Sequence, residues 1–274
     1  MIEKNEIEKY LTTKKLGRNA GLFKEIERST NDYVAEKIEL GESESDTVIA
    51  MVQHGGRGRV GRTWLSGKEG ESVALSFFVS PNVDLEKLPQ LTLVAALCVK
   101  NAIAKSAVSG KLAKEKIKIK WPNDILIGEK KICGILTELK QTTDKNFAII
   151  GIGINIGQKS FEGELASTAS SLSLEGIEIL SIEKLVAEIF NEFEPRLERF
   201  EVDGFASQVE EYNESLTGKN EEASVINSDG KTILEGTIKF ANENGELIIC
   251  DKDGNEKNIS SGELSIRGGF YGRK

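Results

Sequence analysis

A loop rich in glycine and arginine is the strongest chemical feature of this 274-residue sequence. It spans residues 53–64 and carries Arg57, Arg59 and Arg62 among its glycines. Glycines let backbone amides approach a bound anion closely, and arginines supply permanently charged, planar donors for carboxylate and phosphate oxygens. The loop has neither the ending of a Walker loop nor the glycine spacing of a Rossmann fold. We expect it to close over an anion, although a disordered stretch of the same residues would bind RNA without specificity.

Three further motifs accompany this loop in a fixed order along the chain. They are Ser29-Thr30-Asn31, residues 120–126 together with residues 130–136, and Gly151-Ile152-Gly153-Ile154-Asn155. Each motif is moderately specific on its own, and the four in this order are hard to obtain by chance. With the loop they make the chain resemble the biotin protein ligases over about residues 23–267, nearly its whole length.

This resemblance implies an α+β fold with two parts. A mixed β-sheet with helices, as in the biotin and lipoate ligases, is expected over residues 1–218, and an SH3-like β-barrel over residues 219–274. The implied activity converts biotin and ATP, with Mg²⁺, to biotinyl-5'-AMP and pyrophosphate. The biotinyl group then passes to a lysine of a biotin carboxyl carrier protein or domain of a biotin-dependent carboxylase. The runner-up is a lipoate ligase of the same superfamily, which lacks the arginine-rich loop.

The resemblance also assigns roles to individual residues. The residues implied in biotin binding are Ser29, Thr30, Asn31, Gln53, Gly56, Arg57, Arg59 and Lys131. The residues implied in binding ATP or the adenylate are Arg57, Arg59, Arg62, Trp64, Asn123, Asn155, Glu263 and Arg267. Lys131, Arg59 and Asp124 are the implied catalytic residues. Cations suit this chemistry because joining a carboxylate to a phosphate brings two anions together, whose repulsion fixed positive charges and Mg²⁺ must cancel.

Some of these residues have an equally simple structural explanation. The segment 29–31 could be an ordinary N-cap of a helix over residues 33–40. Asp124 could hold Mg²⁺ or accept a proton from the acceptor lysine, and the sequence does not choose. Asn155 could contact a phosphate or ribose, or could be a buried side chain that satisfies its own strand end. The single histidine, His54, is at best a residue that lines the site.

The elements that must position these groups follow from hydrophobic periodicity. Strands that most simply form one mixed sheet are predicted at residues 47–53, 72–79, 116–121, 131–139 and 147–156. Helices are predicted within residues 2–16, from about Pro89, and after an N-cap at Ser181. Turn sequences at residues 228–230, 243–245 and 252–254 supply the glycines that tight hairpins need, and they predict the small C-terminal barrel.

Composition limits the class and the partners. The net charge of −8 argues against a surface built to hold nucleic acid. Only 28 residues precede Ser29, so we expect no DNA-binding domain and no specific DNA partner. The three scattered cysteines and one histidine predict a reduced, cytoplasmic protein without a metal cluster of its own. No apolar run approaches the ~18 residues of a membrane span. The sequence leaves monomer and homodimer open.

Overall fold

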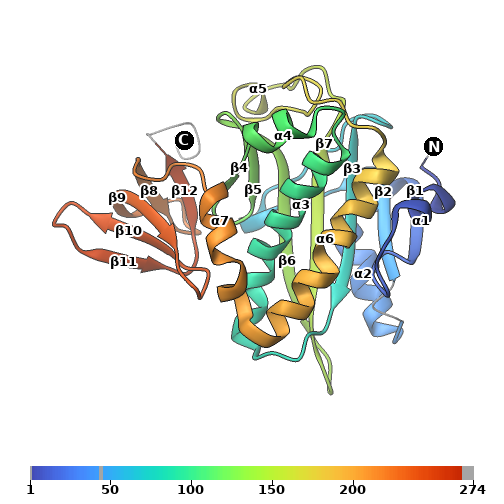
Figure 1. Ribbon diagram of the computed structural model, residues 1–274, viewed down its shortest axis with the longest axis horizontal. Helices are drawn as coiled ribbons and strands as arrows, with labels where there is room; N and C mark the ends of the chain where they lie inside the picture. The colour runs from blue at the N-terminus through green and yellow to red at the C-terminus, as the bar shows by residue number, and fades with distance from the viewer. Residues whose placement is uncertain (1, 43–45, 267–274) are drawn as a thin grey trace.

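The computed structural model describes residues 2–42 and 46–266 and contains two β-sheets, the larger of which is packed against helices (Figure 1). The helices are α1 (Lys4–Tyr10), α2 (Thr30–Glu39), α3 (Leu91–Ser106), α4 (Gly110–Lys116), α5 (Leu165–Thr168), α6 (Ile182–Asp203) and α7 (Val209–Ser215), with 3₁₀ turns η1 (Arg59–Gly61), η2 (Leu85–Gln90) and η3 (Gly204–Gln208). No helix within the described ranges has both the length and the apolar character that a membrane span requires.

The larger sheet has seven strands in the order β1-β2-β3-β7-β6-β5-β4. Its strands are β1 (Asn19–Arg28), β2 (Asp46–Gly55), β3 (Ser72–Val79), β4 (Ile117–Lys120), β5 (Asp124–Ile127), β6 (Lys130–Gln141) and β7 (Asn146–Asn155). Only β1 and β2 pair in parallel, so the predicted mixed sheet is confirmed. The sequence did not predict β1, because this edge strand buries only Ala20 and Ile26 and lacks regular alternation.

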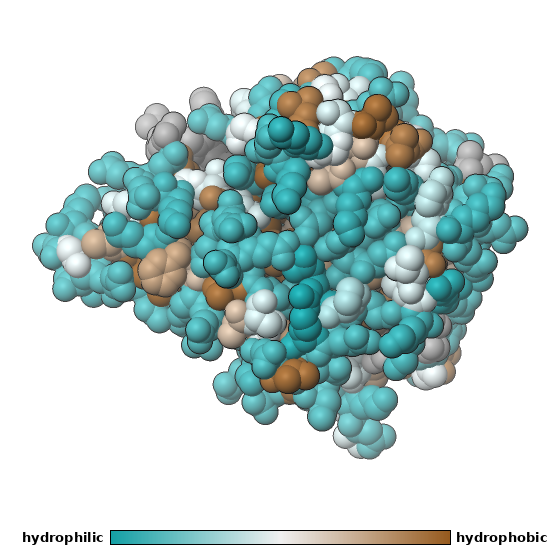
Figure 2. Space-filling view, viewed as in Figure 1, coloured by the Kyte–Doolittle hydropathy of each residue, from teal (hydrophilic) through white to brown (hydrophobic). Residues whose placement is uncertain are grey.

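Both faces of the sheet are covered, because successive residues of the central strand β3 enter different hydrophobic clusters. Phe77 belongs to the main core with α3 and α6, whereas Phe78 packs with Val34 and Ile38 of α2. Figure 1 shows α3 and α6 side by side in front of the sheet. Their outward surface is mainly hydrophilic, as Figure 2 shows, which is the pattern of a helix with one buried stripe.

The predicted helices are present with changed limits. The helix expected within residues 2–16 is α1, which covers only Lys4–Tyr10. Pro89 lies in the 3₁₀ turn η2, and α3 begins directly after it. Ser181 caps α6 as predicted, because its side chain accepts a hydrogen bond from the backbone N–H of Lys184 at 3.0 Å.

An ionic network centred on the buried Arg196 joins α6 to its neighbours. Arg196 contacts Glu211 of α7 at 2.8 Å and Glu192 at 3.1 Å, and Lys105 of α3 reaches Glu192 at 2.6 Å. Burial would raise the pKa of the Glu192 carboxyl group. Hydrogen bonds donated by Lys105 and Asn101 and the nearby positive charges outweigh burial, so this pKa lies below its ordinary value.

The smaller sheet is antiparallel, with the strand order β11-β10-β9-β8-β12. Its strands are β8 (Glu222–Ile226), β9 (Thr232–Ala241), β10 (Leu247–Asp251), β11 (Glu256–Ile259) and β12 (Glu263–Ile266). Each predicted turn is present and uses one device: an Asn or Asp side chain accepts two backbone N–H bonds and a glycine adopts positive φ. These pairs are Asn227 with Gly230, Asn242 with Gly245, and Asp251 with Gly254. Closure of this sheet into an SH3-like barrel and the domain boundary after residue 218 stay predictions.

Candidate active site

One cleft of about 1200 Å³ brings together nearly all the residues that the sequence analysis assigned to the site. It is lined by the start of α2, the loop after β2, the ends of strands β4 to β7 and part of the second sheet. The predicted residues that line it are Ser29, Thr30, Asn31, Gln53, Arg57, Arg59, Arg62, Trp64, Asn123, Asp124, Lys131, Asn155 and Glu263. Gly56 lines a second hollow that shares the arginine loop. Arg267 lies outside the described residues.

The N-terminus of α2 is a helix cap that also lines the cleft, so the cap is confirmed and the biotin-binding role of residues 29–31 stays a prediction. The Ser29 hydroxyl accepts a hydrogen bond from the backbone N–H of Asn31 at 3.3 Å, and the Asp32 carboxylate accepts one from the backbone N–H of Ser29. This reciprocal capping fixes the start of the helix. The side chains of Ser29, Thr30 and Asn31 are buried beside the cleft.

The end of β2 separates Gln53 from His54. Successive strand residues point to opposite faces. Gln53 is buried against the cleft, where its Oε1 accepts a hydrogen bond from the backbone N–H of Thr30 at 3.1 Å. His54 is exposed, pairs with Glu25 and lines a different hollow. His54 therefore does not line the main cleft.

Glycines in β6 and β7 let three side chains lie directly on the sheet. A Cβ atom at Gly151 would stand 2.2 Å from Oδ1 of Asn31, and one at Gly153 would stand 2.4 Å from the Trp64 ring. A Cβ atom at Gly134 would stand 2.9 Å from Nζ of Lys131. The glycine motif of residues 151–155 thus marks a floor that only residues without side chains can form.

The arginine loop is folded as a tight turn. Gly58 donates its backbone N–H to the carbonyl oxygen of Arg62 at 2.7 Å, and Arg62 donates to that of Arg59 at 3.1 Å. Val60 and Gly61 have φ of 54° and 72°, the left-handed region that is strained for a β-branched residue such as valine. The loop is thus ordered against the protein, which disfavours the alternative of a disordered RNA-binding segment.

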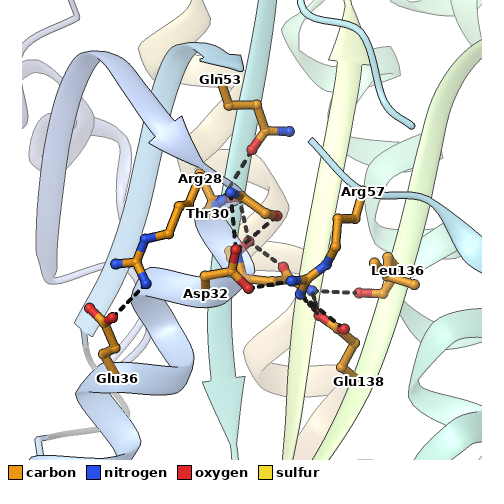
Figure 3. A network of polar contacts seen from close by, with 11 residues as sticks. Arg28, Thr30, Asp32, Glu36, Gln53, Arg57, Leu136 and Glu138 are labelled. Carbon is orange, nitrogen blue, oxygen red and sulfur yellow. Dashed lines mark hydrogen bonds and ion pairs between the residues drawn. The ribbon is translucent and has the colours of Figure 1, made fainter. Parts of the chain in front are cut away.

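Its three arginines contact different walls of the cleft. Arg57 pairs with Asp32 of α2 and Glu138 of β6. Figure 3 shows this guanidinium between the two carboxylates. Arg62 pairs with Glu263 of the second sheet.

Arg59 reaches between the two sheets. It donates to Oδ1 of Asn123 at 3.1 Å and to the carbonyl oxygen of Gly262 at 3.3 Å. Burial lowers the pKa of its guanidinium, and the charges of Asp124 and Glu263 oppose this effect. The side chain nevertheless carries a charge, because an arginine is effectively always protonated.

A cationic group lies beside the strand ends. Lys131 Nζ lies 2.6 Å from Oδ1 of Asp124, and both side chains are largely shielded from solvent. Lys120 also lines the cleft and is 7% exposed. It lies opposite Asp124 in the register of the antiparallel strands β4 and β5. Burial lowers the pKa of Lys120, while the Asp124 carboxylate acts in the opposite direction. Lys120 belongs to the motif of residues 120–126 but was given no role there, because Lys118 and Lys120 alternate with isoleucines in β4 and neither lysine stands out in the sequence.

The two asparagines each donate one side-chain hydrogen bond and accept one within the protein. Asn123 donates to the carbonyl oxygen of Ile135 at 3.0 Å and accepts from Arg59. Asn155 donates to the carbonyl oxygen of Ser170 at 3.0 Å and accepts from Gln158 at 2.9 Å. The contacts of Asn155 support the structural alternative, and its role as a ligand contact stays a prediction.

Comparison with known proteins gives one consistent result. The model of the biotin/lipoate A/B protein ligase family matches residues 22–155. The bifunctional ligase/repressor BirA of Bacillus spizizenii is 33% identical over 97% of this chain and 79% of its own length. BirA of Escherichia coli is 32% identical over 87% of this chain and 71% of its own length.

A solved structure agrees with these sequence relatives. The biotin protein ligase of Aquifex aeolicus in complex with biotin and ATP superposes with a TM-score of 0.72 at 28% identity, covering 91% of this chain and 99% of that one.

Proposed function

The chain belongs to the biotin protein ligase family, and we propose that the cleft described above is where it joins biotin to AMP and then to a carrier protein. The protein is an ATP-dependent ligase that forms biotinyl-5'-AMP, releases pyrophosphate and biotinylates a carrier. One observation carries the assignment of the cleft. Its lining combines buried, uncharged hydrogen-bonding groups, at Thr30 and Gln53, with cationic groups, at Arg59 and Lys131.

These two kinds of group suit the two ends of biotin. The ureido ring offers N–H donors and a carbonyl acceptor, which the side chains of Ser29, Thr30 and Gln53 can match. The biotin carboxylate then points to Lys131. The glycine floor seats Asn31, Trp64 and Lys131 directly on the sheet, which leaves room above them for the ligand.

The first chemical step requires cations because two anions react. A carboxylate oxygen attacks the α-phosphorus of ATP, the new C–O–P linkage forms, and the bond to the pyrophosphate oxygen breaks. Arg59, Arg62 and Lys131 are placed to stabilise the negative charge that develops. Because Arg62 and Lys131 are paired with Glu263 and Asp124, the substrates must replace or share these partners.

The carboxylates in the cleft fit a magnesium ion that is held mainly by phosphate oxygens. Mg²⁺ commonly uses one or two carboxylates together with substrate phosphates and water. Asp124 is placed to supply one such oxygen, since it lies among the cations that would face the phosphates. When bound, the ion would neutralise charge on the pyrophosphate leaving group.

The second step moves the biotinyl group to an amine. A lysine amine must lose a proton before it attacks, and with an ordinary pKa of ~10.4 few lysines are neutral at pH 7. We assign the proton to the carboxylate of Asp124, which lines the cleft beside Lys131. The amine attacks the acyl carbon, AMP leaves with the C–O bonding electrons, and an amide remains.

The partner and the setting extend this proposal. The acceptor is a biotin carboxyl carrier protein or domain, in line with relatives named biotin–[acetyl-CoA-carboxylase] ligase. We place the reaction in the cytoplasm and leave monomer and homodimer open.

Pyrophosphate release that depends on biotin tests the proposal directly. The protein should release pyrophosphate from ATP when biotin is added and should not when lipoate replaces it. Isothermal titration with the two acids provides the matched binding measurement. Equal turnover with lipoate, or none with biotin, would contradict the assignment.

A further inference from the structure

A chain of short hydrogen bonds runs from the surface of β6 to the wall of the cleft. It joins Glu138, Asn31, Ser76 and Thr30, in that order. We infer that Glu138 sets the direction of the protons in this chain, so that the Thr30 hydroxyl presents only an acceptor to the ligand. Glu138 is therefore a positioning residue that selects a ligand N–H. The inference rests on the proposed function, because it names which polar group of biotin the cleft distinguishes.

The first link fixes the orientation of the Asn31 amide. Its Nδ2 lies 2.6 Å from Oε2 of Glu138 and 3.5 Å from the carbonyl oxygen of Leu136. Both neighbours are acceptors, so the NH₂ group must face them. Oδ1 of Asn31 then faces Ser76 at 2.5 Å. Asn31 is 2% exposed and packs against Gly151, so the two ends of its amide keep these two positions, and the hydrogen-bond partners decide which end is the oxygen.

The second link fixes the hydroxyl of Ser76. A serine hydroxyl has one proton, and Ser76 has two polar neighbours, Oδ1 of Asn31 at 2.5 Å and Oγ1 of Thr30 at 2.6 Å. Oδ1 of an amide only accepts, so the proton of Ser76 goes there. The bond to Thr30 then requires that Thr30 donates its own proton to Ser76.

The last link determines what a ligand meets. The proton of Thr30 points away into the protein, so the remaining lone pair of its hydroxyl oxygen faces the cleft and can accept a hydrogen bond from a ligand N–H. Gln53 is complementary, because its Oε1 already accepts from the backbone of Thr30 and leaves Nε2 as a donor. An adjacent acceptor and donor match the N–H and C=O groups of a cyclic urea.

The charge on Glu138 is held by the arginine loop. Arg57 donates to both carboxylate oxygens, at 2.8 and 3.0 Å, and Figure 3 shows Arg57 and Glu138 in contact near Thr30. An ionised carboxylate only accepts hydrogen bonds, which is what the first link needs. A glutamine would put an NH₂ group into this position. The amide of Asn31 could then turn over, Ser76 would donate to Thr30, and Thr30 would donate to the ligand.

The experiment compares biotin with analogues that lack one N–H. The probes are biotin and the two cyclic carbamates in which one ureido N–H is replaced by oxygen. The variants are Glu138→Gln and Ser76→Ala, which break the chain at different links. Asp32→Asn is the matched control, because it also removes a carboxylate that pairs with Arg57, keeps an oxygen that can accept the capping bond from Ser29, and lies outside this chain of bonds. Dissociation constants come from isothermal titration, and melting curves establish that each variant is folded.

The deciding quantity is the ratio of the dissociation constants for the carbamate and for biotin, not the affinity for biotin alone. Wild type and Asp32→Asn should bind biotin about tenfold or more better than one of the carbamates, since an unmatched buried acceptor is costly. In Glu138→Gln and Ser76→Ala this ratio should fall close to one, because Thr30 can turn its proton to the ring oxygen.

Several outcomes would overturn the inference. They are a ratio that stays at the wild-type value in either broken-chain variant, a collapse of the ratio in Asp32→Asn, or a wild type that does not discriminate. A wild type that binds neither biotin nor the carbamates would instead overturn the proposed function itself.

Discussion

Replacing Lys131 with alanine should nearly abolish adenylate formation and leave the protein folded. The ammonium group lies 2.6 Å from Asp124 and lines the cleft, where the proposed function brings the biotin carboxylate and the α-phosphate together. Without this charge the two anions repel each other during the reaction. No backbone hydrogen bond is lost, because the change affects only the side chain beyond Cβ.

The size of each effect follows from this environment. Loss of one oriented donor at a developing negative charge typically lowers the rate about 10²–10³-fold. The change also leaves the Asp124 carboxylate, whose side chain is 14% exposed, without its lysine. An unsatisfied buried group costs about 1–3 kcal/mol. Lys120 and Arg59 remain nearby, so we expect the lower end of this range and a fall in Tm of roughly 2–4 °C.

The assay is biotin-dependent pyrophosphate release, with thermal unfolding as the stability measurement. Lys130→Ala is the matched control, because Lys130 is the exposed neighbour on the same strand. The double variant Lys131→Ala/Asp124→Ala should regain the lost stability and stay inactive. Wild-type turnover in a folded Lys131→Ala protein, or an equal loss in Lys130→Ala, would refute the reasoning.

Three further outcomes are expected. Arg59→Gly removes the side chain that joins the loop to the second sheet, so adenylate should still form but escape, and streptavidin blotting should detect biotin on bystander albumin above the wild-type level. Gly153→Ala places a methyl group against the Trp64 ring. It should lower the free energy of unfolding by about 1–3 kcal/mol, measured by denaturant unfolding, or weaken ATP binding at least severalfold, measured by titration. Arg196→Met should lower the free energy of unfolding by about 2–4 kcal/mol at pH 7. Because the pKa of Glu192 is lowered in the folded protein, the stability that its ionised carboxylate contributes is complete above its ordinary pKa of 4.5 and is lost as the pH falls through the lowered value. The difference in free energy of unfolding between Arg196→Met and wild type should therefore be smaller at pH 3.

Local patterns explain which parts could be predicted from the sequence. The arginine loop was predictable because its chemistry lies within twelve consecutive residues. The three hairpins of the second sheet were predictable because each turn carries its own glycine and its own capping side chain. The cap at Ser29 was predictable for the same reason.

Features that depend on distant partners could not be predicted in this way. Glu138 and Ser76 are single polar residues in strands, and their importance arises from contacts with Asn31, which is 107 and 45 positions away. Edge strand β1 has no clear alternation because little of it is buried. Lys120 is distinguished only by the burial that the folded sheet imposes.

The wall of the cleft is assembled from both halves of the chain, with Ser29 near its beginning and Leu264 near its end. During synthesis, which proceeds from the N-terminus, the first sheet can form while the second sheet, from Glu222 onward, is still absent. A nascent chain at that stage lacks Glu263, which pairs with Arg62, and the backbone carbonyl that Arg59 contacts. An unfinished polypeptide is therefore not expected to generate the reactive mixed anhydride beside the ribosome. The enzyme should become active only after β12 has been synthesised and has joined the second sheet.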